Sequence, residues 1–199
     1  MARQLPDWIA TVVIVAGLLI VPARVSAAEN FAELIGQSDQ NAAVITHYGY
    51  VTHAKGLNDA ALFFDPLVRT EATAKYTFYA TTVLNARHVH GNIITTASSP
   101  GQFIVYERAS GGADFNDPDS FRVGTAILSF AVRYFNVLNV QGQNQQGQST
   151  GIASATAVLG DGYGLRLRLT ATGQGTLLVN DPPTVVSTIL LGGFVVEEP

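Results

Sequence analysis

The chain has 199 residues, no cysteine and a formal net charge of −4 at pH 7. The absence of cysteine excludes a disulfide framework, a thiol nucleophile and a cysteine zinc site. The lack of any basic block argues against nucleic acid or an anionic membrane surface as a partner. Because 47% of the residues are hydrophobic and only 13% are charged, a core can form without covalent cross-links.

The first 27 residues have the features of a secretory signal peptide in the usual order. Arg3 gives a basic start, residues 8–21 form an apolar run, and residues 25–27 provide a cleavage site. The run is shorter than the roughly 20 residues that a membrane helix needs. Asp7 is atypical of a signal peptide and leaves a retained membrane anchor as the alternative. We expect residues 1–27 to be removed and the protein to be extracellular or periplasmic, with no stable membrane insertion.

The remaining chain predicts an N-terminal segment over residues 28–41, in which residues 29–37 form either a helical turn or only a mobile terminus, and one β domain over residues 42–199. Alternating apolar and polar residues, rich in Thr, Val, Tyr, Phe and Ile, predict strands between breaks made of Gly, Asn, Asp and Pro. Asn58 or Asp59 is placed to cap a short helix in the first connection. In chain order, the expected strands lie within 42–53, 71–92, 92–97, 101–109, 121–140, 152–160, 163–173, 176–181 and 184–196.

This pattern of eight or nine strands with regularly spaced turns and no long helix defines an all-β fold. It suits either a closed antiparallel β-barrel or a β-sandwich. We favour a single closed barrel of about eight strands, because apolar strands at both ends of the domain can pair and closure removes exposed edges.

Residues 101–143 carry a resemblance to a known family. An apolar strand, "GQFIVYERA", leads into the polar loop "SGGADFNDPDS" and then into "FRVGTA", followed by "YFNVLNVQGQ". This order resembles the corresponding segment of allene oxide cyclases and plant dirigent proteins. The resemblance implies an eight-stranded, calycin-type barrel with an apolar cavity. The cyclases isomerise a reactive fatty-acid epoxide with little acid–base chemistry, and dirigent proteins steer radical coupling without an oxidising centre of their own.

Aromatic residues are the candidate ligand-binding side chains. On the inner face of a barrel they can line a cavity for a small apolar molecule, and the alternative is that they fill an eight-stranded barrel completely. The candidates are Tyr48, Tyr76, Phe78, Phe103, Phe130 and Tyr134.

His88 and His90 form an H-x-H pair, a spacing that can direct two imidazoles to one zinc or copper ion. If the alternation that starts at Tyr76 and Phe78 continues, both rings face the interior, together with His47 and His53 in one possible gathering. Turn-forming residues surround the pair, and a bulge would break the alternation. We therefore favour a hairpin rim over a metal site or a pocket floor.

Asp114, Asp117 and Asp119, with Asn116, offer oxygen ligands of the kind that calcium prefers. Their spacing does not match an EF-hand, and the same residue types form ordinary turns. We therefore treat them as weak metal candidates and expect no cofactor.

No catalytic residue can be assigned from the sequence. The chain lacks G-x-S-x-G, P-loop and G-x-G-x-x-G motifs. Glu107 is a candidate buried acid at the end of an apolar strand, although Arg108 beside it suggests a solvated strand end. The preferred function is binding of a small apolar molecule without a cofactor. The alternatives are a cofactor-free cyclase or isomerase, and a structural envelope or extracellular-matrix protein, which the Gln-rich segment 141–151 suggests.

Overall fold

The computed structural model describes residues 30–143, 148–160, 166–179 and 185–197. The predicted signal peptide lies outside the described residues, so its removal stays a prediction. The described chain is all-β, as expected, with short 3-10 helices in two connections. Its elements are β1 (Ala32–Asn41), β2 (Val44–Ala54), η1 (Asp59–Leu62), η2 (Glu71–Thr73), β3 (Tyr76–His90), β4 (Ile93–Ser98), β5 (Gly101–Glu107), η3 (Pro118–Arg122), β6 (Thr125–Gln143), β7 (Gln148–Gly160), β8 (Arg166–Val179) and β9 (Val185–Glu197). Within these ranges, no helix is long and apolar enough to cross a membrane.

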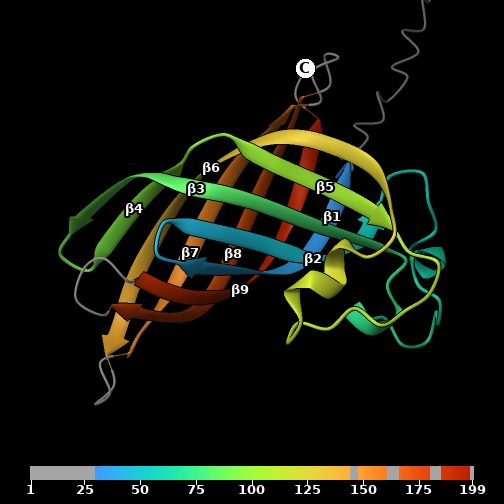
Figure 1. Ribbon diagram of the computed structural model, residues 1–199, viewed down its shortest axis with the longest axis horizontal. Coiled ribbons are helices and arrows are strands. Elements are labelled where there is room, and N and C mark those ends of the chain that lie inside the picture. The colour runs from blue at the N-terminus through green and yellow to red at the C-terminus, as the bar shows by residue number, and fades with distance from the viewer. Residues whose placement is uncertain (1–29, 144–147, 161–165, 180–184, 198–199) are drawn as a thin grey trace, which may run out of the picture.

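The strands form one antiparallel sheet, not the two stacked sheets of a sandwich (Figure 1). The hydrogen-bonded order is β2-β1-β9-β8-β7-β6-β4-β3-β5, and two further pairings join β2 to β3 and β6 to β5. These pairings close a ring of eight strands: β1, β2, β3, β5, β6, β7, β8 and β9. Every strand in the ring therefore has a hydrogen-bonded neighbour on each side.

The ninth strand, β4, shares its place in the ring with β5. Both strands pair with β3 and β6, with β5 opposite the first half of β3 and β4 opposite the second half. At their junction, the buried Ser98 hydroxyl accepts a hydrogen bond from the backbone N–H of Tyr134 at 3.1 Å. Gly101 is required here because a Cβ atom would lie 2.2 Å from the carbonyl oxygen of Thr81.

The helical turn expected at residues 29–37 is wrong, because the chain forms β1 from Ala32 onward. This strand pairs with β2 along one edge and with β9 along the other, in register from Ala32 opposite Val195 to Asn41 opposite Val186. Two ladders of backbone hydrogen bonds outweigh the weak local helix preference. The described part of the predicted N-terminal segment thus belongs to the sheet.

Most other expectations agree with the structure. The short helix η1 is present, and the Asn58 side chain caps it by accepting a hydrogen bond from the backbone N–H of Ala60 at 3.0 Å. The strand expected from residue 121 instead starts at Thr125, because residues 118–122 form η3 and Gly124 has a φ of 131°. The two strands expected within residues 163–181 are one continuous strand, β8.

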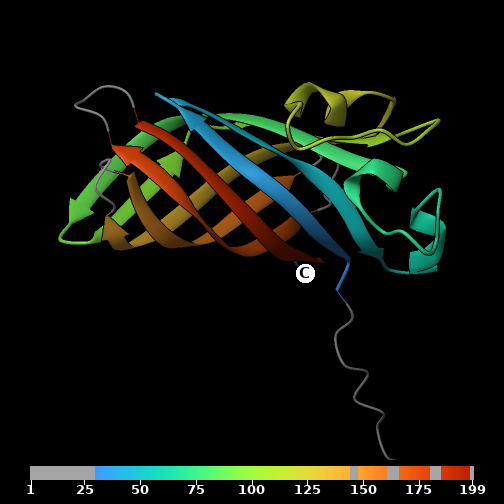
Figure 2. The ribbon, with the colours of Figure 1, turned by 90° about the horizontal axis from the view of Figure 1, so that it is seen from below.

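Residues 108–124 form a cover on the outer face of the sheet (Figure 2). Phe121 is fully buried and packs against Tyr48 of β2, with ring centroids 5.2 Å apart. The Thr77 hydroxyl of β3 donates a hydrogen bond to the carbonyl oxygen of Phe121 at 2.7 Å. The cover therefore buries part of the outer face of β2 and β3, so that these strands are enclosed on both sides.

The inner faces of the strands form the main core. The larger cluster of buried residues includes Leu34, Phe78, Phe103, Phe130 and Leu167. A smaller cluster of buried residues consists of Ile94, Leu138, Ala153 and Ile189. Between and beside these clusters, the interior is not completely filled.

Candidate functional site

The interior is hollow because one part of its wall carries only small side chains. Four successive inward positions of β7 carry small residues, Gly151, Ala153, Ala155 and Ala157, and Ala155 lies opposite Ala171 of β8. The wall formed by β3, β5 and β6 instead carries large side chains, among them Phe78, Phe103 and Tyr134. Rings from one wall facing methyl groups from the other leave space between them.

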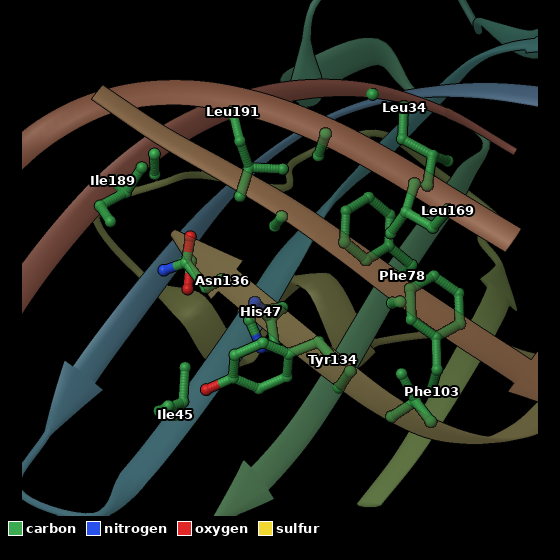
Figure 3. A pocket seen from close by; sticks show the side chains of 18 of the residues that line it. Leu34, Ile45, His47, Phe78, Phe103, Tyr134, Asn136, Leu169, Ile189 and Leu191 are labelled. Atoms are coloured by element: carbon green, nitrogen blue, oxygen red, sulfur yellow. The ribbon is translucent and has the colours of Figure 1, made fainter. Parts of the chain in front are cut away.

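The first space, here called the central chamber, has a volume of about 70 Å³ (Figure 3). Its apolar wall carries large side chains and the small residues of β7 and β8. Its polar wall is formed by the side chains of Ser38, Gln40, His47, Thr96, Tyr134 and Asn136. Among the described residues, no Asp, Glu, Lys or Arg lines this chamber.

The second space, here called the end chamber, has a volume of about 300 Å³. Its wall is almost entirely apolar, with Lys55 and Tyr76 as the exceptions. Leu34 and Phe103 line both chambers and therefore form the partition between them. The two chambers are thus neighbours along the interior, one apolar and one with a polar wall.

Four buried side-chain atoms in the described chain have no hydrogen-bond partner: His47 Nε2, Thr82 Oγ1, Tyr134 Oη and Asn136 Oδ1. Three of these side chains line the central chamber, and Figure 3 shows His47, Tyr134 and Asn136 directed into the same part of it. Buried polar groups in folded proteins are nearly always paired, so each exception needs an explanation. A bound molecule whose polar group forms the missing hydrogen bonds would fit here.

The same burial keeps the polar wall uncharged. Burial lowers the pKa of His47 to about 4, and the Asp39 carboxylate opposes this shift only partly. Burial also raises the pKa of Tyr134 to about 12, against a smaller opposing effect from the neighbouring Thr82 hydroxyl. At neutral pH the site therefore presents a neutral imidazole, a phenol and an amide. Such groups donate and accept hydrogen bonds but do not balance a ligand charge.

Five of the six aromatic candidates line one of the chambers. Phe78 and Tyr134 line the central chamber, Tyr76 and Phe130 line the end chamber, and Phe103 lies between them. Tyr48 lies outside both, on the outer face. Because side chains alternate along a strand, His47 points inward and Tyr48 points outward beneath residues 108–124.

His47 and Asn136 were not predicted as site residues. His47 shares one face of β2 with Ile45, Gly49 and Val51, but Tyr48 and Tyr50 make the opposite face equally apolar, so the alternation did not single it out. The alternating small residues at positions 151–157 were a signal for the hollow wall.

His88 and His90 lie at the hairpin rim, as favoured above. Both are exposed near the end of β3, and the chain turns through Gly91, whose φ is 58°. The register shifts between Leu84 and Ala86, so the alternation does not carry through to the histidines. Over the described ranges, no group of three or more His, Cys, Asp or Glu residues is placed to hold a metal ion.

The acidic loop residues make bonds within their own turn. The Asp114 carboxylate accepts from the Asn116 backbone N–H at 2.9 Å, and Asp117 caps η3 by accepting from the Asp119 backbone N–H at 3.2 Å. Asp119 also pairs with Arg122 at 3.0 Å. These bonds are those of a turn.

Glu107 is exposed and accepts a hydrogen bond from the Tyr76 hydroxyl at 3.3 Å. The buried charged residue is its neighbour Arg108, which is 8% exposed. Glu107 is therefore solvated at the strand end, as the neighbouring Arg108 suggested, and it is not a buried acid.

Comparisons with family models, with curated proteins and with solved structures found no match to this chain. The resemblance of residues 101–143 to allene oxide cyclases and dirigent proteins therefore stays a prediction. The function has to be argued from the two chambers and from the polar atoms on their walls.

Proposed function

We propose that the ring of strands acts as a barrel that binds one small, mainly apolar molecule in its interior without a cofactor. The observation that carries this proposal is the pair of unfilled chambers, one of which exposes buried polar atoms that lack partners. A core that served only stability would fill this space, because protein interiors are close-packed and voids are destabilising.

The end chamber supports this proposal by its size and chemistry. Its volume of about 300 Å³ reaches the lower end of the range of ~300–1,000 Å³ for small-molecule sites. Each methylene group moved from water onto its wall contributes about 0.8 kcal/mol.

A cofactor-free cyclase or isomerase is the second candidate. It is favoured by the Tyr134 hydroxyl and the His47 imidazole on a chamber wall, where they are neutral and water can be excluded. The Tyr134 hydroxyl could polarise a bound oxygen atom by donating a hydrogen bond. A structural role stays a prediction, since part of the Gln-rich segment 141–151 lies outside the described residues.

Binding is tested with Nile red, a neutral dye whose emission rises in apolar surroundings. We expect saturable binding of one dye per full-length chain. Ala54→Phe places a ring in the end chamber, which Ala54 lines, and should weaken dye binding at least tenfold. Ala131→Phe makes the same change at an exposed position of β6 that lines neither chamber and should leave the affinity unchanged. Equal affinity of the two variants would place the dye on the outer surface and contradict the proposal.

A further inference from the structure

Three polar atoms in the central chamber define a subsite, here called the head site: His47 Nε2, Tyr134 Oη and Asn136 Oδ1. Tyr134 is only 4% exposed, and the imidazole and phenol rings lie edge to face with centroids 4.9 Å apart. Folding has removed these atoms from water, and none of them forms a protein hydrogen bond of normal geometry, although the Thr82 hydroxyl, itself unpaired, lies near Tyr134 Oη. A ligand that restores those hydrogen bonds gains more than one that fills only the apolar space.

The head site lies away from the open end of the interior. On one side, the central chamber is bounded by Ala153 and Ile189, which pack with the buried Ile94 and Leu138. On the other side, the central chamber meets the end chamber at Leu34 and Phe103. The end chamber is lined by side chains that also reach solvent, namely Leu57 at 54%, Leu128 at 44% and Ile127 at 43% exposure. A ligand that reaches the head site from the end chamber leads with its polar group and leaves its apolar part behind it.

The head-site atoms select the kind of polar group. The Tyr134 hydroxyl donates, Asn136 Oδ1 accepts, and His47 Nε2 does either according to its tautomer. A ligand hydroxyl can accept from Tyr134 and donate to Asn136, and a ligand carbonyl can accept from Tyr134. An ionised carboxylate or ammonium group would lose its hydration in a chamber whose described lining carries no opposite charge.

We propose that the head site binds the hydroxyl or carbonyl group of a neutral, otherwise apolar molecule whose apolar part extends through the partition into the end chamber. This inference rests on the proposed function, since it assigns the ligand class and its direction to the same interior. The unpaired atoms could also be served by water alone, because the central chamber is large enough and polar enough to hold it. The two possibilities differ in what happens when the polar group of a ligand is changed.

The test uses one eight-carbon chain with three head groups, 1-octanol, octanoate and octylammonium, each measured by displacement of Nile red at pH 7.5. We expect 1-octanol to bind at least tenfold more tightly than either ion. If Nile red binds inside and all three compounds displace it equally, the head site holds only water and this inference fails while the proposed function stands. If Nile red does not bind inside, the proposed function itself fails.

Tyr134→Phe tests the hydrogen bonding of the head site separately from the packing of the aromatic ring. It removes the hydroxyl and keeps the ring, so the affinity for 1-octanol should fall roughly 3- to 10-fold and that for octanoate should not fall. The melting temperature without ligand should stay the same or rise, because an unpaired buried hydroxyl has been removed. Tyr106→Phe makes the same change on β5 at a residue that lines neither chamber and should change neither quantity. A stability loss in Tyr134→Phe with unchanged 1-octanol affinity would overturn the proposal.

Discussion

The imidazole of His47 meets the phenol ring of Tyr134 edge to face, with centroids 4.9 Å apart and planes 78° apart. The two residues belong to β2 and β6, which are not hydrogen-bonded neighbours in the sheet. Their contact therefore spans the interior. Burial shifts the two pKa values in opposite directions, so that both rings are neutral across the physiological range.

His47 should make the protein less stable in acid. Its pKa is 6.5 in an unfolded chain and about 4 in the folded protein, so the unfolded chain takes up a proton first as the pH falls. The free energy of unfolding should therefore fall from about pH 6.5 down to about pH 4 and then level off. The His47 contribution approaches about 3 kcal/mol.

Urea titrations of the wild type and of His47→Gln at several pH values between 8 and 3.5 check this expectation. The wild type should lose more stability than the variant over that interval. Parallel pH profiles would show that His47 titrates normally in the folded protein.

Gly49→Ala should be strongly destabilising. A Cβ atom at this position would lie 2.1 Å from the carbonyl oxygen of Ile35 and 2.5 Å from the Cα atom of Gly36. Because both are backbone atoms of the paired strand β1, the strands must separate, at a cost of about 3 kcal/mol or more. Gly192→Ala is the control, since nothing lies within 4 Å of its Cβ position. Urea unfolding should show a change within about 0.5 kcal/mol for Gly192→Ala, and similar losses in both variants would contradict this account.

Tyr48→Phe should lower the free energy of unfolding, because it removes hydrogen bonds on the outer face of β2. The Tyr48 hydroxyl donates to Asp39 Oδ2 at 2.5 Å and accepts from Gln37 Nε2 at 2.6 Å, and the residue is fully buried. Loss of a buried hydrogen bond to a charged group should cost about 1–3 kcal/mol, measured by urea unfolding at pH 7. Tyr79 lies directly opposite on β3, and Tyr79→Phe should cost markedly less. Equal losses would assign the effect to ring packing.

Arg108→Met should loosen the cover formed by residues 108–124. The Arg108 guanidinium donates to the carbonyl oxygens of Ser110, Gly111, Ser120 and Val123. Methionine keeps the apolar stem and leaves these acceptors unpaired, so we expect a loss of about 2–4 kcal/mol. Hydrogen exchange at residues 110–123 should accelerate.

Arg122→Met is the matched control for this change. The Arg122 side chain is 52% exposed and pairs with Asp119 at the surface, and exposed ion pairs contribute at most about 1 kcal/mol. Equal acceleration of exchange in the two variants would exclude Arg108 as the residue that holds the cover.

The sequence predicted the local elements well, because each is determined by short-range patterns. Alternation marked the strands, the Asn58 cap marked η1, and Gly91 marked the end of the β3–β4 hairpin. It did not predict β1, which pairs both with the adjacent β2 and with β9, about 150 residues further along the chain.

Alternation also failed to separate the inner from the outer face of β2. Tyr48 and Tyr50 are 0% and 6% exposed, as buried as typical inward residues, because residues 108–124 and the segment around Phe63 cover them from outside. His47, by contrast, looked like the polar side of the strand although it faces the chamber. When both faces of a strand are buried, both faces carry apolar residues, and the alternation does not show which face points into the interior.

The pairing of β1 with β9 also sets the order in which the chain can mature during synthesis. Until residues 185–197 have left the ribosome, both β1 and β8 lack one neighbour and present unsatisfied backbone edges to other chains. Closure of the ring, and with it the formation of a chamber wall from β9, is therefore the last step available to the growing polypeptide. Its rate decides how long the nascent chain exposes these strand edges to pairing with other chains.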